Sequence, residues 1–192
     1  PPPVAKSALP AREEPQRTTA SPPAATPVKG DLHADVLVLG AGPGGYTAAF
    51  RAADLGKRVV LVERWPTLGG VCLNVGCIPS KALLHIAMVI TEAADAHEAG
   101  IVFAQPKVDL AKLRQWKSNV VGRLTKGLGA LAKQRKVEVV QGSGTFASAQ
   151  SVRVEIGGQA KVVSFDHCII AAGSESARIP GFPYDDKRLL DS

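Results

Sequence analysis

The sequence predicts an α/β fold built around a parallel sheet, and three consecutive patterns carry that prediction. Residues 36–39 form a short apolar run, as expected of a strand that is buried on both faces. A helical pattern follows over residues 46–55 and ends at Gly56, a residue that suits a helix C-cap, and a second apolar run covers residues 59–62. A strand, a helix and a strand in this order form a β-α-β unit, whose two strands lie parallel.

The rest of the chain predicts two further helices and a small antiparallel β-meander. A glycine-rich loop with two cysteines leads into an Ala- and Leu-rich helix over residues 80–97, which ends near Gly100. A second helix is expected in the basic segment 107–136. Gly157 and Gly158 suit a hairpin turn between two later strands. Those strands are expected over residues 137–140, 152–156, 161–163 and 167–170.

Composition places the chain among globular proteins of about one domain. It has 192 residues, of which 45% are hydrophobic and 21% are charged. No apolar run reaches the roughly 18 residues of a membrane span, so we expect no contact with a membrane. Three cysteines are too few for a disulfide-stapled secreted domain. We therefore expect a cytoplasmic protein whose paired cysteines serve catalysis or metal binding.

The first part of the chain predicts a disordered Pro/Ala-rich linker. Residues 1–30 hold eight of the 14 prolines and show no apolar periodicity, which is typical of a semi-rigid spacer. We expect the linker to cover residues 1–33 and a folded domain to cover residues 34–192. The chain begins with Pro1 and its only methionine is Met88, so we also expect it to be excised from a longer polypeptide.

The formal net charge of +6 raises the question of a nucleic-acid partner. Much of the excess lies in residues 107–136, where nine Lys and Arg residues oppose Asp109 alone. The apolar residues of this segment recur at helical spacing, so we expect the cations on a solvated outer face and no nucleic-acid partner. These apolar residues are Leu110, Leu113, Val120, Leu124, Leu128 and Leu131.

A dinucleotide-binding turn is predicted between the first strand and its helix, where residues 40–45 match G-x-G-x-x-G. Gly40 allows the tight turn, Gly42 lets the backbone approach a pyrophosphate, and Gly45 lets the helix pack closely on the strand. The helix N-terminus then faces the phosphates. Glu63, 18 residues after Gly45, is placed to bind an adenosine ribose and disfavours a 2′-phosphate. The motif alone does not separate NAD from FAD.

Cys72 and Cys77 form the pattern C-x4-C. On a regular helix their Cα atoms would lie about 8–9 Å apart, which is beyond the roughly 7 Å that a disulfide allows. A disulfide therefore requires an irregular turn, and Asn74, Gly76 and Pro79 tolerate or enforce one. A thiol at the start of the following helix would gain thiolate character, which suits redox exchange.

A zinc site is the alternative interpretation of the pair, with Cys168 and a histidine completing the ligands. The absence of a second close pair of ligands disfavours it. His167 and Cys168 are neighbours on a predicted strand and point to opposite faces, so we expect Cys168 to be a buried apolar residue. We expect His33, His85 and His97 to be structural or surface residues.

The segment from Gly69 to His85, GGVCLNVGCIPSKALLH, resembles the flavin-dependent pyridine nucleotide-disulfide oxidoreductases. Within that family it is most similar to the branch that oxidises dihydrolipoamide. Glutathione and mercuric reductases share the C-x4-C frame but differ around Leu73 and Ile78. The resemblance runs from about Asp35 to the end of the chain. It implies an α/β, Rossmann-like FAD-binding domain with a parallel sheet and a small antiparallel β-meander, preceded by the disordered Pro/Ala linker.

The resemblance also implies a set of site residues. Cys72 and Cys77 would form a catalytic, redox-active disulfide, with Cys77 nearer the flavin and Cys72 exchanging with the substrate. Lys81 would approach the flavin ring, and Gly144 would lie near the adenine. No metal site is implied. The residues expected to bind FAD are Gly40, Gly42, Pro43, Gly44, Gly45, Glu63, Arg64, Gly69, Gly70, Val71, Cys72, Lys81, Gly144, Ala172 and Gly173.

The implied reaction is the oxidation of dihydrolipoamide, carried on a lipoyl domain of a 2-oxo acid dehydrogenase complex, with NAD as the final acceptor. The chain lacks the family's second glycine motif, which binds NAD, and its C-terminal His-Glu pair. We therefore expect the parent protein to be a homodimeric enzyme and this chain alone to be inactive. The alternatives are another disulfide reductase, of the glutathione or mercuric type, and a non-catalytic dinucleotide-binding module.

Overall fold

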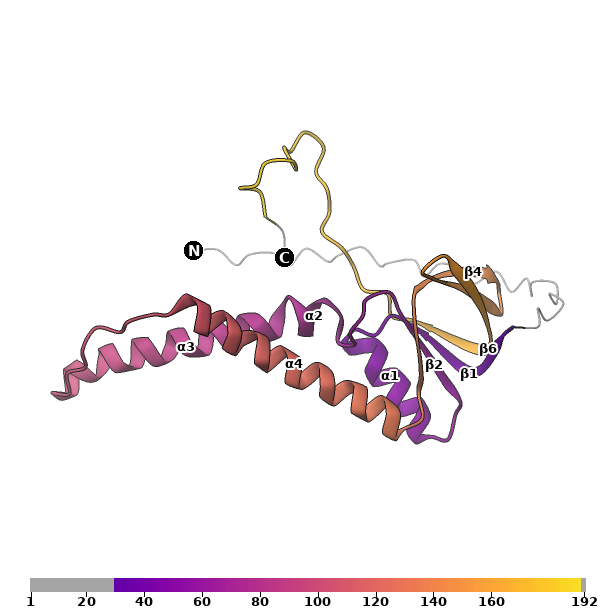
Figure 1. Ribbon diagram of the computed structural model, residues 1–192, viewed down its shortest axis with the longest axis horizontal. Coiled ribbons are helices and arrows are strands. Elements are labelled where there is room, and N and C mark those ends of the chain that lie inside the picture. The colour runs from indigo at the N-terminus through magenta and orange to yellow at the C-terminus, as the bar shows by residue number, and fades with distance from the viewer. Residues whose placement is uncertain (1–29, 191–192) are drawn as a thin grey trace, which may run out of the picture.

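The computed structural model describes residues 30–190, so most of the linker predicted over residues 1–33 lies outside the described residues. Figure 1 shows a sheet at one end of the molecule and two long helices that extend away from it as an arm. The arm consists of α3 (Cys77–Asp95) and α4 (Leu110–Gln134), and α4 runs back along α3 toward the sheet.

One six-stranded sheet forms the body of the molecule. Its strands are β1 (Leu32–Leu39), β2 (Val59–Glu63), β3 (Glu138–Gln141), β4 (Ser143–Ser148), β5 (Ser151–Ile156) and β6 (Gln159–Ile170), and they lie in the order β3-β2-β1-β6-β5-β4. β1 pairs in parallel with both β2 and β6, and β2 pairs in parallel with β3. β4, β5 and β6 pair antiparallel. The predicted parallel sheet and antiparallel meander are therefore both present, as parts of the same sheet.

β6 is a single strand where the sequence predicted two. Residues 159–164 of β6 pair with β5 and residues 163–170 pair with β1, so that β6 joins the antiparallel part of the sheet to the parallel part. The sequence prediction also missed β4, which is polar over most of its length. Gly157 and Gly158 form the two-residue connection between β5 and β6, as predicted.

The helix that follows β1 is α1 (Pro43–Asp54). It begins three residues before the predicted start at residue 46, because Pro43 occupies the first helical turn, where its missing N–H removes no helical hydrogen bond. The predicted Ala- and Leu-rich helix begins at Cys77 rather than at Ser80, and a short 3-10 helix, η1 (Ala96–Ala99), follows it. Gly100 then ends the segment with a φ of +83°, as predicted.

The predicted cysteine-containing loop includes a short helix, α2 (Gly70–Asn74), which was not expected. α4 occupies most of the basic segment predicted to be helical. Its N-terminus is capped by Asp109, whose carboxylate accepts hydrogen bonds from the backbone N–H groups of Ala111 and Lys112, each at 3.0 Å.

Two clusters of buried side chains hold the sheet and its covering elements together. One cluster joins Leu61 of β2 to Phe50 of α1 and Ala132 of α4. The other joins Val62 of β2 to residues of β5 such as Val152, which is fully buried. The meander thus covers one face of the parallel strands and the helices cover the other, and the carboxyl ends of β1 and β2 remain available for a site.

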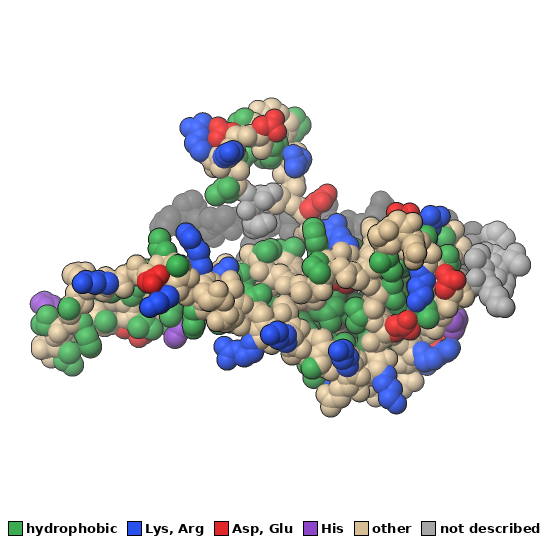
Figure 2. All heavy atoms as spheres, viewed as in Figure 1, with side chains coloured by type: hydrophobic (Ala, Val, Ile, Leu, Met, Phe, Trp, Pro, Cys, Tyr) green, Lys and Arg blue, Asp and Glu red, His purple; other side chains and the backbone are tan. Residues whose placement is uncertain are grey.

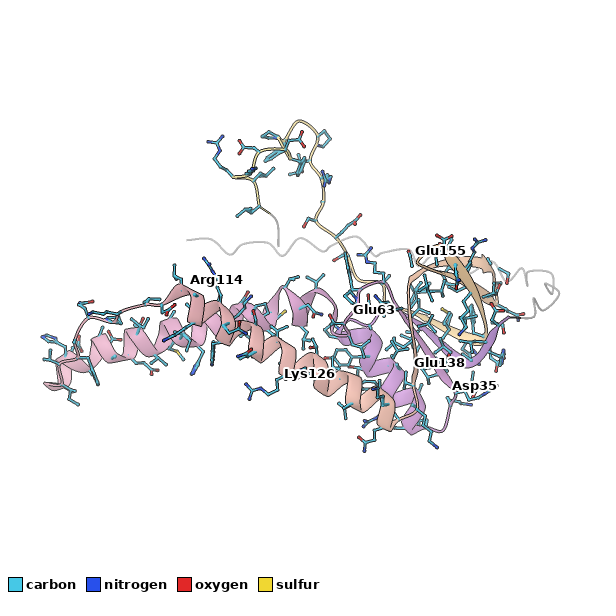
Figure 3. All side chains as sticks on the ribbon, viewed as in Figure 1. Asp35, Glu63, Arg114, Lys126, Glu138 and Glu155 are labelled. Carbon is cyan, nitrogen blue, oxygen red and sulfur yellow. The ribbon has the colours of Figure 1, made fainter. Side chains whose placement is uncertain are left out.

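The arm leaves many apolar side chains exposed, and Figure 2 shows several of them (green) toward its tip. On α3, Leu84 is 67% and Met88 is 55% exposed. Half of the apolar residues that recur at helical spacing along the basic helix are also exposed. Leu110, Leu124 and Leu131 are exposed, whereas Leu113, Val120 and Leu128 are half-buried. The cations labelled in Figure 3, Arg114 and Lys126, are exposed as predicted.

Within residues 30–190, one helical stretch is long and apolar enough to cross a membrane by those criteria alone. It is Gly70–Ala99, with a mean hydropathy of 1.5 over its most apolar 18-residue window, 17% of which is buried. The same stretch is broken between α2 and α3, and Lys81 and His85 interrupt its apolar run. Core helices of soluble proteins that meet these criteria are mostly buried, whereas this stretch is mostly exposed on the arm.

Candidate dinucleotide and dithiol site

The glycine turn between β1 and α1 has the geometry that the motif predicts. Gly40 has a φ of +97°, and a Cβ atom at Gly45 would collide with the carbonyl oxygen of Gly40. α1 begins at Gly42 as N-cap without any side-chain cap, and Gly44 has open space where a side chain would be. The first N–H groups of α1 therefore point outward unpaired by side chains, which suits a pyrophosphate.

Glu63 ties this turn to the end of β2. Its side chain is 5% exposed, Oε2 accepts the backbone N–H of Ala41 at 2.7 Å, and Oε1 accepts the backbone N–H of Trp65 at 2.9 Å. Figure 3 shows Glu63 where the sheet meets the helices. Each carboxylate oxygen retains a further lone pair for a ligand hydroxyl. The sequence predicted the position of Glu63 but not these two bonds, which make it part of the turn itself.

A second glycine pair packs directly on the first turn. The backbone N–H of Gly69 donates to the carbonyl of Ala41 at 2.8 Å. Gly70 has a φ of +60°, and a Cβ atom there would lie 2.7 Å from the Cα of Gly42. Ala41 is thus bonded through both of its backbone polar groups: its N–H donates to Glu63 and its carbonyl accepts from Gly69. The start of α2 is held against the dinucleotide turn by this arrangement.

Residues from the meander close the other side. The N–H of Gly142 donates to the carbonyl of Glu63 at 2.8 Å. A Cβ atom at Gly144 would lie 2.7 Å from Cδ1 of Leu39 and would also crowd Val152, so β4 passes closely over the end of β1. After β6, the N–H of Ala171 donates to the carbonyl of Leu39 at 2.8 Å, just before Ala172 and Gly173. The predicted residues of β1, β2, β4 and β6 thus converge at one edge of the sheet.

The two cysteines lie on different helices. Cys72 is on α2, and Cys77 is the first residue of α3. Between them the N–H groups of Val75 and Gly76 both donate to the carbonyl of Val71, at 3.0 and 2.7 Å, which breaks the helical path. The irregular turn that a disulfide would require is therefore present. Both residues are free thiols in this structure.

The electrostatics of Cys72 are set by its neighbours. The hydrogen bond between its thiol and that of Cys77, followed by desolvation, raises the pKa of Cys72 above its ordinary value of 9.0. The backbone N–H of Cys77 and the charge of Lys81 act in the opposite direction, with smaller effects. Cys72 is therefore held as the neutral thiol by Cys77 and by desolvation, and the backbone N–H of Cys77 and the charge of Lys81 oppose this only in part.

Asn74, which the sequence prediction left out of the site, bonds to the loop that precedes α2. Its Nδ2 donates to the carbonyls of Gly70 at 2.9 Å and of Leu68 at 3.2 Å, and its Oδ1 accepts from Thr67 Oγ1 at 2.9 Å. The prediction treated Asn74 only as a residue that tolerates an irregular backbone. The tendency of Asn side chains to bond nearby backbone groups was the signal that could have found it.

The unpaired cysteine, Cys168, lies on β6, and His33 lies near the start of β1. In the described part of the chain, the one cluster of three potential metal ligands is His33, Asp35 and Asp166, which contains neither paired cysteine. His33 is exposed, as expected, and lies 3.4 Å from Asp166. Cys168 is half-buried against the core of the meander, and burial raises the pKa of its thiol. Among the described residues, Cys72 and Cys77 therefore belong to no cluster of three potential ligands.

Comparison with known proteins agrees with this geometry. Residues 34–191 match the family described as pyridine nucleotide-disulphide oxidoreductase. The chain belongs to this family. The resemblance and the Rossmann-like fold inferred from the sequence are thereby confirmed.

Curated members of the family give a finer comparison. The dihydrolipoyl dehydrogenase of Vibrio parahaemolyticus is 54% identical over 162 residues, which are 84% of this chain and 34% of the relative. That of Vibrio cholerae is also 54% identical over 162 residues, and that of Haemophilus influenzae is 53% identical over 163, with the same coverage. The chain thus spans about a third of the length of the curated relatives that it matches.

Proposed function

We propose that the chain is the FAD-binding part of a flavin-dependent disulfide oxidoreductase that oxidises dihydrolipoamide. One observation carries the proposal: the helix that bears Cys72 packs, through Gly70, directly on the turn that bears Gly42. A redox-active cysteine pair and a dinucleotide turn are therefore parts of one structure. The name shared by the relatives, dihydrolipoyl dehydrogenase, supports the choice of substrate.

FAD fits the residues that would hold it. The uncapped N-terminus of α1 would bind the pyrophosphate, and the open space at Gly44 leaves room for it. Glu63 would accept the ribose hydroxyls with its remaining lone pairs, and Gly144 would let the adenine approach β4. Lys81 would approach the flavin. The other predicted contacts, which flank these residues, are Gly40, Pro43, Gly45, Arg64, Gly69, Gly70, Val71, Cys72, Ala172 and Gly173.

The cysteine pair would carry out the thiol chemistry. One thiolate of dihydrolipoamide attacks Cys72 in the Cys72–Cys77 disulfide and releases the Cys77 thiolate, and the second substrate thiol then displaces Cys72. The products are lipoamide and two cysteine thiols, so two electrons move to the protein. When bound, FAD would accept those electrons and pass them to NAD. The N-terminus of α3 would stabilise the negative charge that develops on Cys77.

The partners follow from the same proposal. Dihydrolipoamide would arrive on a lipoyl domain of a 2-oxo acid dehydrogenase complex, in the cytoplasm, and the full-length protein would act as a homodimer with its NAD site outside this chain. The exposed apolar side chains of α3, such as Leu84 and Met88, support pairing with further protein.

The test uses the full-length protein and measures NADH formed from dihydrolipoamide. Cys72→Ser and Cys77→Ser should each abolish it, because either change prevents the disulfide. Cys168→Ser, which changes the one cysteine outside the pair, should retain most of the activity. Undiminished turnover in either paired variant would refute the assigned roles. A colourless protein that binds no FAD would favour the non-catalytic module instead.

A further inference from the structure

The strongest unassigned feature of the site is the side-chain amide of Asn74, which lies between the two cysteines in the sequence. It makes three hydrogen bonds, two as donor to the carbonyls of Gly70 and Leu68 and one as acceptor from Thr67. Thr67 and Leu68 belong to the loop that enters α2, and Gly70 is the first residue of α2. The amide therefore ties the end of α2 back to its beginning.

α2 needs such a tie. It has five residues, which is too short for a helix to be stable on its own. Its N-cap residue is Gly69, whose φ is +112° and which offers no side chain to cap the helix. Two consecutive glycines with positive φ, Gly69 and Gly70, precede the first thiol, and such a segment has many alternative conformations when unconstrained. The bonds of Asn74 to this segment remove that freedom.

The same bonds connect the cofactor side of the site to the thiol side. Gly70 accepts from Asn74 and packs on Gly42, and Cys72 lies between Gly70 and Asn74 on the same short helix. If α2 loosens, the Cys72 thiol moves relative to the N-terminus of α3. Disulfide formation depends on close approach of the two residues, because the Cα atoms must lie within about 7 Å.

We propose that Asn74 is a positioning residue that holds Cys72 in place for reversible disulfide formation with Cys77. It touches neither sulfur and acts through the loop of residues 67–70. Removing it leaves the dithiol form free to sample more conformations, so that more conformational entropy is lost when the disulfide closes. The equilibrium then shifts toward the dithiol. This inference rests on the proposed redox role of the pair.

The test measures the equilibrium Cys72–SH + Cys77–SH + GSSG ⇌ Cys72–S–S–Cys77 + 2 GSH in glutathione buffers. After acid quenching and alkylation of free thiols, the tryptic peptide of residues 65–81 contains both paired cysteines and reports the oxidised fraction by mass. Asn74→Ala should lower the equilibrium constant about tenfold, which corresponds to about 30 mV for a two-electron couple. A residue that only supported the fold would change the thermal stability and leave this constant unmoved.

Matched variants keep the test decisive if Asn74→Ala fails to fold. Thr67→Val removes one of the three bonds and should shift the constant in the same direction by a smaller factor, whereas Thr67→Ser keeps the hydroxyl and should not shift it. Asn119→Ala, which removes a bonded but exposed amide on α4, should also leave it unchanged. If the equilibrium constants of Asn74→Ala and Thr67→Val both lie within twofold of the unsubstituted protein, the positioning role of Asn74 is overturned and the proposed function still stands. A parent pair that forms no disulfide in any glutathione buffer would overturn the proposed function as well.

Discussion

The substitution Glu63→Gln tests the bonds that hold the glycine turn in place. The carboxylate of Glu63 is buried and accepts two backbone N–H groups, those of Ala41 and Trp65, one on each oxygen. Glutamine has nearly the same shape, but one of its two terminal atoms is an NH2 group, which donates. One of the two N–H groups must therefore lose its acceptor and face another donor.

The cost follows from these bonds. A hydrogen bond to a charged group contributes about 1.5–3 kcal/mol, and a buried donor left without a partner costs about 1–3 kcal/mol. We expect Glu63→Gln to lower the free energy of unfolding by about 2–3 kcal/mol. For a domain of this size, each kcal/mol shifts the melting temperature by about 2–4 °C, so the expected loss is about 4–12 °C.

Thermal unfolding of the 192-residue chain, followed by circular dichroism, measures this loss. Glu155→Gln is the matched control, because Glu155, also labelled in Figure 3, has a side chain that is 66% exposed and lies 3.5 Å from Arg153. Such surface ion pairs contribute about 0–1 kcal/mol. If Glu63→Gln costs no more than Glu155→Gln, the carboxylate does not hold the turn and the reasoning is refuted.

Three further substitutions test other parts of the structure. Gly45→Ala should destabilise the chain by about 1–3 kcal/mol in urea unfolding, since its Cβ would meet the backbone of the glycine turn. Gly44→Ala should not, because Gly44 has open space there. Equal stabilities of the two variants would contradict this packing. Gly144→Ala should cost a similar amount because its Cβ lies 2.7 Å from a β1 side chain, and a neutral result would show that β4 can move away. The backbone N–H and the guanidinium of Arg58 hold the pKa of Asp35 below its ordinary value of 3.8. Because ionised Asp35 stabilises the folded state, Asp35→Asn should lower the melting temperature near neutral pH. The difference in melting temperature should disappear as the pH falls below 3.8, where Asp35 becomes protonated. A difference that stays constant down to acid pH would exclude the Asp35–Arg58 pair as its cause.

The sequence predicts the parallel part of the fold well because burial on both faces leaves continuous apolar runs. Val59 to Val62 are all buried, and the predicted run 59–62 begins where β2 begins and ends one residue before β2 ends. The start of β1 was missed because His33 is exposed there and breaks the run. β6 was divided for a similar reason: Ser164 bonds to the carbonyl of Leu32 at 3.1 Å, and Asp166 is exposed.

β4 could not be predicted from its own residues. Its segment, SGTFAS, has no apolar alternation, and it becomes a strand by pairing with β5 along one edge. Phe146 packs edge-to-face against Phe165 of β6, with ring centroids 6.3 Å apart. Both interactions depend on partners that are distant in sequence, so no local pattern reports them.

The features of the site also divide into those that the sequence predicts and those that it does not. The glycine positions were predictable because backbone conformation and close approach exclude side chains at Gly40 and Gly45, and the motif expresses those requirements. The bond of Glu63 to Ala41 was not predictable, since it joins a side chain to a backbone group 22 residues away whose placement depends on tertiary packing, whereas the bonds of Asn74 are local and follow the tendency of Asn side chains to bond nearby backbone groups.

The most direct test of the central claim is the visible absorption spectrum of FAD bound to the chain, recorded with the cysteine pair oxidised and then reduced in a glutathione buffer. If the pair lies against the flavin, reduction should change the flavin spectrum, Cys77→Ser should remove that change, and Cys168→Ser should preserve it. A flavin spectrum that is the same in both redox states of the pair would contradict the account.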